Sequence, residues 1–177
     1  NNHLDEIISK YINPTPIDFK FEKNDEKSTE WFDRLVYTDT HIGMDVNGKA
    51  GDTMYESKWD KEELNTRLKK MIEHVLKYQK SDTLVIDDLG DFLDGMGGQT
   101  TRRGHELPQN MNDREVFDLG LSFKVSMIDS LIPYYDKIIC NDITNDNHSG
   151  FFSYFVSSSF EKIMKERYPN NVEVITR

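Results

Sequence analysis

The sequence is poor in cysteine, in long apolar runs and in positive charge, and each shortage excludes a class of protein. Cys140 is the only cysteine in 177 residues, so no disulfide can form within the chain, and we expect a reducing compartment, the cytoplasm. The longest apolar stretches, such as 151–156, are far shorter than the roughly 20 residues of a membrane-spanning helix. The N-terminal residues also lack a basic region followed by an apolar stretch, so we expect neither a secretory signal nor a membrane partner.

Acidic residues outnumber basic residues by 32 to 22, which gives a formal net charge of −10. This charge argues against a broad, sequence-independent hold on nucleic acid, because such binding needs a basic face that displaces counterions from phosphates. A local phosphate site is still compatible with it, because a metal ion can supply positive charge that side chains do not. The surplus carboxylates are therefore either solvated surface or, in part, metal ligands.

The distribution of polar and apolar segments divides the chain into a polar lead-in, 1–30, which includes a short helix, and an α/β domain, 31–177. Short apolar runs predict strands at 35–37, 83–86, 138–140 and 172–175. Apolar spacings of three and four predict helices from Asp60 through Leu76, from Asn112 to Pro133, and over 151–167. Glu63 and Glu115 complete capping boxes with Asp60 and Asn112. The alternation predicts a mainly parallel sheet flanked by helices.

Polar clusters follow the first three predicted strands, at 39–41, 87–94 and 145–148. Open α/β sheets bind their ligands outside the carboxyl ends of the strands. The candidate ligands there offer oxygen and imidazole donors: Asp39, His41, Asp91, Asp94, Asn147 and His148. This mixture suits manganese, iron or zinc, with magnesium as a further option. Asp91, in the middle cluster, is suited to bridge two ions about 3.5–4 Å apart.

Three short motifs follow these strands in order: Asp39-x-His41, Gly90-Asp91-x-x-Asp94 and Asn147-His148. Their order, spacing and strand context resemble the calcineurin-like metallophosphoesterases. The loop over 97–110 further resembles phage-encoded members, which look like DNA-repair exonucleases. The resemblance covers the N-terminal part of that family only. It implies that 31–177 is the first part of a four-layer α/β/β/α sandwich, incomplete at its C-terminal end.

The resemblance also implies a centre of two divalent metal ions, at which a metal-bound hydroxide attacks the phosphorus of a phosphate ester. Asp39 and His41 would bind the first ion. Asp91 would bridge the two ions, and Asn147 would bind the second.

In the same family, the histidine that matches His148 stabilises the transition state or protonates the leaving oxygen, and the aspartate that matches Asp94 holds it in place. Arg102, Arg103 and His105 lie in a glycine-bearing loop after the middle motif. They are either substrate-binding residues, which would contact a phosphate or a nucleic-acid backbone, or solvated loop charges.

The chain departs from the family pattern in two ways. Asp146 and Ser149 stand where the family usually has a glycine and an acidic residue, and no histidine follows His148, although the family completes its metal shells with later histidines. We therefore expect the sequence to be a piece of a longer protein that binds metal weakly or partially and is inactive by itself.

These observations support three functions. The first is a metal-dependent phosphodiesterase or nuclease that acts on nucleic acid or nucleotides. The second is a phosphomonoesterase, such as a protein phosphatase. The third is a non-catalytic module that retains the fold with a degraded metal site. The sequence does not indicate an oligomeric state.

Several other residues have two interpretations. Asp87, Asp88, Asp142 and Asp146 are either polar groups at strand ends or supporting groups of the site. Cys140 lies on an apolar strand with no base beside it in the sequence, so we expect it to pack in the core. The aromatic residues at the start of the last predicted helix are expected to face the core, with a base-stacking platform as the alternative: Phe151, Phe152, Tyr154 and Phe155.

Overall fold

The computed structural model describes residue 21 and residues 27–46 and 57–177. The short helix predicted in the lead-in therefore lies outside the described residues. The domain is built on a sheet of parallel strands in the order β1-β2-β3-β4. The strands are β1 Asp33–Tyr37, β2 Thr83–Asp88, β3 Lys137–Asp142 and β4 Val172–Thr176. All of the predicted strands are confirmed, each slightly longer than its apolar run.

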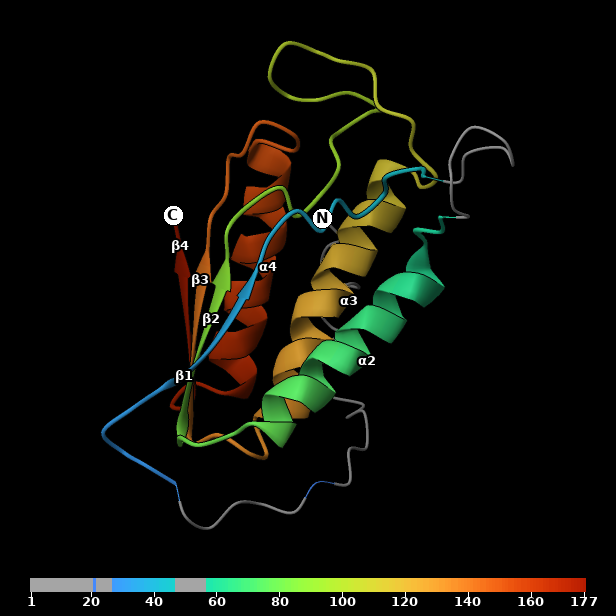
Figure 1. The fold of residues 1–177 in the computed structure, drawn as a ribbon. Helices are drawn as coiled ribbons and strands as arrows, with labels where there is room; N and C mark the ends of the chain where they lie inside the picture. The colour runs from blue at the N-terminus through green and yellow to red at the C-terminus, as the bar shows by residue number, and fades with distance from the viewer. Residues whose placement is uncertain (1–20, 22–26, 47–56) are drawn as a thin grey trace.

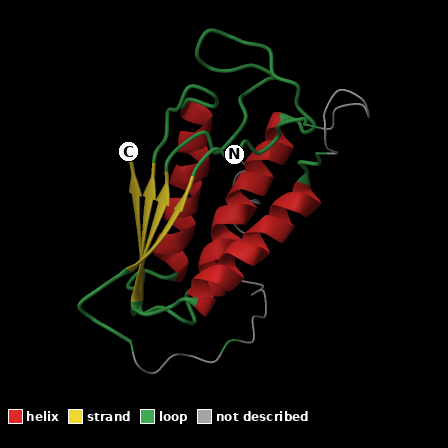
Figure 2. Ribbon diagram, in the orientation of Figure 1, coloured by secondary structure: helices red, strands yellow, loops and turns green. Residues whose placement is uncertain are grey.

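The helices are α2 Lys61–Lys77, α3 Asp113–Leu131 and α4 Phe151–Arg167. They connect consecutive strands and lie on one face of the sheet, with α3 packed between α2 and α4 (Figures 1 and 2). A strand order that follows the chain, with right-handed crossovers, places every connecting helix on the same face. The predicted α/β fold with a parallel sheet is confirmed. Within the described residues, no helix is both long and apolar enough to cross a membrane.

Side chains at the N-termini of α2 and α3 determine where these helices begin. The Asp60 carboxylate accepts hydrogen bonds from the backbone N–H groups of Glu62 and Glu63, at 3.0 Å each. Asn112 and Glu115 form the complete reciprocal capping box that the sequence predicts. These contacts satisfy N–H groups that have no partner within the helix.

The core lies between the sheet and the three helices. Together with Leu121 and Val125, it contains all of the α3 residues that the periodicity predicts: Val116, Leu119, Phe123, Met127, Ile128 and Leu131. Cys140 is buried on β3, and burial raises the pKa of its thiol, which is consistent with a packing role.

The prediction that the aromatic residues at the start of α4 face the core is wrong for all but Phe152. Phe152 is 7% exposed, whereas Phe151, Tyr154 and Phe155 are 69%, 43% and 56% exposed. The reason is the helical period, because Phe152 and Val156 occupy the core-facing stripe of α4 at a spacing of four. The other aromatic residues fall on the opposite side of the helix.

A buried ion cluster lies where β1, β2 and β3 end, and we call it the Lys124 cluster. The Lys124 side chain, 2% exposed, lies 2.7 Å from Asp88 Oδ2 and 3.1 Å from Asp142 Oδ1. Its ammonium also donates a hydrogen bond to the Tyr37 hydroxyl at 3.2 Å. Burial alone would lower the pKa of Lys124, but Asp142 and Asp88 raise it well above its ordinary value, so the ammonium stays charged.

Replacing Lys124 by Met should strongly destabilise the fold, because it leaves two buried carboxylates without a cation. Removal of one partner from a buried ion pair costs about 3–5 kcal/mol. Lys137→Met is the matched control, because Lys137 pairs with Glu173 at 3.5 Å on the surface, where a pair contributes about 0–1 kcal/mol. Urea unfolding followed by circular dichroism gives both values, and equal losses would contradict a structural role for the Lys124 cluster.

Candidate metal centre

The loops after β1 and β2 run side by side at the carboxyl edge of the sheet. The backbone N–H of Asp39 donates to the carbonyl of Gly90 at 3.1 Å, and the N–H of His41 donates to the carbonyl of Asp91 at 3.0 Å. These bonds bring the first two sequence motifs together. The third motif follows β3, which pairs with β2, and therefore reaches the same edge.

The backbone at this edge is strained. Asp39, His41 and Asp91 have φ angles of 51°, 44° and 49°, and Asn145 has a φ of 61°. Non-glycine residues rarely adopt this left-handed conformation, and each such residue costs on the order of 1–3 kcal/mol unless its surroundings enforce it. Strain of this kind concentrates at binding and catalytic sites. These four residues lie in the loops that carry the motifs, and Arg103, with a φ of 71°, is the remaining described non-glycine residue in this conformation.

The side chains of His41, Asp91 and His148 converge, and we call them the His–Asp–His cluster. Each offers a ligand atom, and these atoms lie within 4.8 Å of one another. The two imidazole rings are 4.4 Å apart between centroids. Burial is the main reason that the pKa of Asp91 is raised, and Asp146 and Asp39 add to this effect. Asp91 Oδ1 is buried and has no hydrogen-bond partner, so the cluster holds an unsatisfied acceptor beside two imidazoles.

Asp94 contacts both rings of the His–Asp–His cluster. Its Oδ1 lies 3.0 Å from His41 Nδ1 and 3.6 Å from His148 Nδ1, and its backbone carbonyl oxygen lies 3.3 Å from His148 Nδ1. The hydrogen bond with Asp94 raises the pKa of His41, whereas burial of the ring opposes this change. Because Asp94 engages Nδ1 of each ring, Nε2 of each is left for a metal ion or a substrate.

The other two predicted metal ligands lie beside the cluster. Asp39 Oδ1 is 3.6 Å from His41 Nε2, and the Asp39 side chain is 61% exposed. Asn147 lines a neighbouring cavity with His148. The structure thus brings His41, Asp91 and His148 together, with Asp39 next to His41 and Asn147 in the cavity that His148 also lines. Their assignment as ligands of two separate ions stays a prediction.

The cavity that contains Asn147 and His148 also contains the predicted substrate-binding residues. It has a volume of about 560 Å³. Its lining includes Arg102, Arg103 and His105. Cationic groups therefore lie next to the exposed side of the His–Asp–His cluster, as a phosphate site would need.

Asp146 has a structural role that the motif comparison missed. Its Oδ1 accepts hydrogen bonds from the backbone N–H groups of His148 at 3.0 Å and Ser149 at 2.7 Å, and the Ser149 hydroxyl also bonds to the same carboxylate. Asp146 and Ser149, the two departures from the family pattern, therefore form a turn that fixes the backbone of His148. An aspartate two residues before a loop position is a known signal for such a turn.

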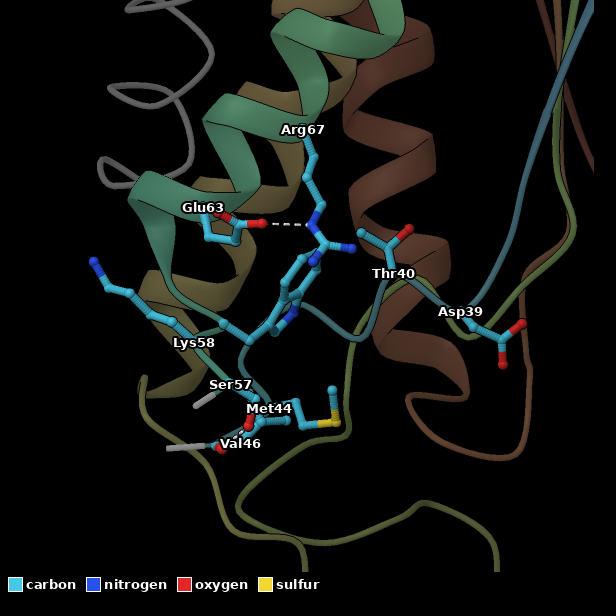
Figure 3. Close-up of a pocket in the computed structure, with 9 residues that line it drawn as sticks. Asp39, Thr40, Met44, Val46, Ser57, Lys58, Glu63 and Arg67 are labelled. Atoms are coloured by element: carbon cyan, nitrogen blue, oxygen red, sulfur yellow. Dashed lines mark hydrogen bonds and ion pairs between the residues drawn. The ribbon is translucent and has the colours of Figure 1, made fainter. Parts of the chain in front are cut away.

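A second cavity, of about 600 Å³, lies on the β1 side of the site (Figure 3). Its polar groups largely bind one another: Arg67 Nε donates to Glu63 at 2.7 Å, and the Arg67 guanidinium lies 4.9 Å from the centre of the Trp59 ring. Trp59 Nε1 donates to the carbonyl of His41 at 3.0 Å. This hydrogen bond from Trp59 supports the strained backbone of His41. Asp39 also lines the cavity.

Comparison with known proteins assigns no family: no family model matches the chain, and no curated protein and no solved structure is significantly similar to it. The arrangement of its own residues is therefore the basis for a functional argument.

Replacing Asp94 by Asn should lower the pKa of His41 in the metal-free protein, because the Asp94 carboxylate raises it. An NMR titration of the His41 ring proton in the presence of EDTA measures the change. Asp136→Asn is the control, since Asp136 is an exposed residue before β3, and it should leave the His41 titration unchanged. An unaltered pKa in Asp94→Asn would show that Asp94 does not control this imidazole.

Proposed function

We propose that this protein is a metal-dependent phosphoesterase of the calcineurin-like class, and specifically a phosphodiesterase or nuclease that acts on nucleic acid or nucleotides. The observation that carries the proposal is the His–Asp–His cluster, in which Asp91 lies close to two imidazoles and has a buried oxygen without a hydrogen-bond partner. The chain has a single cysteine, Cys140, which is buried and not in a disulfide, and this favours the cytoplasm as the compartment.

The donor set of the cluster suits a divalent cation such as manganese, iron or zinc. His41, Asp91 and the adjacent Asp39 would hold one ion, and Asp91 with Asn147 would hold a second. The unsatisfied Asp91 Oδ1 fits a bridging role, because a cation removes the cost of burying that oxygen. Two bound cations would supply an activated water and would neutralise charge that develops on the phosphoryl oxygens.

The remaining steps belong to side chains of this chain. Asp94 would hold His148 through Nδ1 and keep its Nε2 directed at the substrate. His148 Nε2 would donate a proton to the leaving oxygen, which is general acid catalysis. Arg102 and Arg103 would bind a non-bridging phosphate oxygen or a neighbouring phosphate.

A non-catalytic module is the second candidate. It is favoured by the small number of converging ligands. Among the described residues, the His, Cys, Asp and Glu side chains that lie close enough together to share a metal ion are His41, Asp91 and His148. Such a module would use the same fold and the same edge for binding alone.

Replacing Asp91 by Asn should abolish both metal binding and hydrolysis. We expect the affinity for Mn²⁺ to fall by roughly 100-fold or more, because loss of a supporting partner alone costs about 10–100-fold. Isothermal titration with Mn²⁺ measures binding, and release of nitrophenol from bis(nitrophenyl) phosphate by the full-length gene product measures turnover. Asp136→Asn is again the control, with an exposed carboxylate outside the motif loops.

The outcomes separate the candidates. Retained metal binding and turnover in Asp91→Asn would contradict the assignment of Asp91. Turnover of a nitrophenyl monoester but not of the diester would favour a phosphomonoesterase. Metal binding without turnover of either ester by the full-length gene product would favour the non-catalytic module.

A further inference from the structure

An exposed aromatic surface begins three residues after His148. Phe151, Tyr154 and Phe155 occupy the first turns of α4, and their exposed fractions range from 43% to 69%. We call these three residues the aromatic platform. Their neighbour Phe152 is buried and stacks against Phe117, so the helix is anchored while the platform faces solvent.

A basic turn, residues 100–105, packs against the start of the platform. A Cβ atom on Gly150 would lie 2.6 Å from Thr101 Oγ1, so the Thr101 side chain packs directly against the Gly150 backbone, where only glycine leaves room for it. The Thr101 N–H donates to the carbonyl of His148 at 2.8 Å, and the Arg102 N–H donates to the carbonyl of Asn147 at 3.3 Å. The basic turn is thus fixed between the His–Asp–His cluster and Phe151.

The turn is also ordered internally. The backbone N–H of Thr100 donates to the carbonyl of His105, and the N–H of His105 donates to Thr100 Oγ1, both at 2.9 Å. Arg102 and Arg103 are exposed. No ion pair joins either guanidinium to a carboxylate of the described residues, although the protein is acidic overall. Their charge is therefore available to a ligand.

We propose that the aromatic platform and the basic turn together bind a single-stranded nucleic acid whose scissile phosphate lies at His148. This inference rests on the proposed phosphodiesterase function and adds its substrate class. The guanidinium groups bind phosphates of the backbone, and the aromatic rings stack on unpaired bases. A single strand fits better than a duplex, because the faces of paired bases are already stacked on one another.

The charge of the basic turn favours a nucleic acid over a second protein as the ligand of the platform. An apolar contact between proteins would not need the unpaired cations of Arg102 and Arg103 beside it. A polyanion with flat apolar rings can bind the guanidinium groups through its charges and the aromatic platform through its rings. The basic turn lies between His148 and the start of the platform, so a strand that runs from His148 to the platform would pass over it.

Binding is tested on the full chain in EDTA, so that it does not depend on hydrolysis. Fluorescence anisotropy measures the affinity for labelled oligothymidylate, oligouridylate and a DNA duplex. We expect both single strands to bind more tightly than the duplex, and their relative affinities distinguish DNA from RNA as the source of the strand. Weaker binding of both single strands than of the duplex would overturn the inference.

Two pairs of substitutions test the two groups of side chains. Phe151→Ala with Phe155→Ala should weaken single-strand binding by about 5–150-fold for each ring that stacks on a base. Arg102→Ala with Arg103→Ala should reduce the slope of log affinity against log salt by about 1.4, since each phosphate contact contributes about 0.7. All of these side chains are exposed, so the folded state should persist, as circular dichroism would verify.

Matched controls lie at the opposite end of the fold. Lys162 and Lys165 are exposed on the last turns of α4, far from Gly150 (Figure 1), and Phe32 is 56% exposed before β1. Lys162→Ala with Lys165→Ala, and Phe32→Ala, should leave binding unchanged. Equal effects of the control and test variants would overturn the inference.

Failure of this inference is distinguishable from failure of the proposed function. If the full-length gene product hydrolyses bis(nitrophenyl) phosphate but binds no single strand, the substrate class is wrong and the phosphodiesterase stands. If it binds a single strand through these residues but hydrolyses no ester, the binding site stands and the enzyme does not. If Phe151→Ala with Phe155→Ala changes self-association in gel filtration but not strand binding, the platform contacts a second copy and the inference is wrong.

Discussion

The ends of β2 and β3 each carry an aspartate, and the parallel register places these two carboxylates opposite one another, Asp88 beside Asp142. Like charges in that position repel, so the edge of the sheet depends on Lys124, which reaches both from α3. Asp88 also accepts a hydrogen bond from the Gly90 N–H, directly before Asp91, and Ser157 donates one to Asp142. A buried ion cluster adds little net stability, because desolvation of its charges offsets their attraction. It instead links the last residues of β1, β2 and β3, directly before the motif loops.

Those loops contain several carboxylates and several residues in the left-handed backbone conformation. The contacts of the fold do not fully offset the free-energy cost of either. Asp91 has a buried oxygen without a hydrogen bond, and Asp94 has another in its Oδ2. Both lie beside imidazoles in a segment held by hydrogen bonds to the strained backbone of residues 39–42. Unsatisfied buried acceptors cost free energy in the absence of a ligand. A divalent cation is the simplest ligand that satisfies the carboxylates and uses the imidazole nitrogens that Asp94 leaves open.

The helices and strands were predictable because short-range signals specify them. Capping residues mark where α2 and α3 begin, and the apolar period of α3 identifies the face it buries. The motif residues were predictable as a group, since parallel strands end at one edge. Lys124 was not, because it lies between Phe123 and Val125 in an apolar segment and has partners far away in the sequence. The aromatic residues of α4 were assigned to the core by type, whereas their exposure depends on which stripe of the helix Phe152 and Val156 occupy.

An acidic chain that binds a nucleic-acid strand needs an affinity that does not depend on many phosphate contacts. The basic turn offers two guanidinium groups, so counterion release contributes a small part of the binding and leaves it only weakly salt-dependent. The rings of the platform can supply the larger part, because stacking on a base contributes about 1–3 kcal/mol and is indifferent to net charge. The surplus of carboxylates would then oppose long duplexes, which present many phosphates at once, more than a short unpaired strand. If the chain binds nucleic acid as proposed, its net charge of −10 would favour single strands over duplexes.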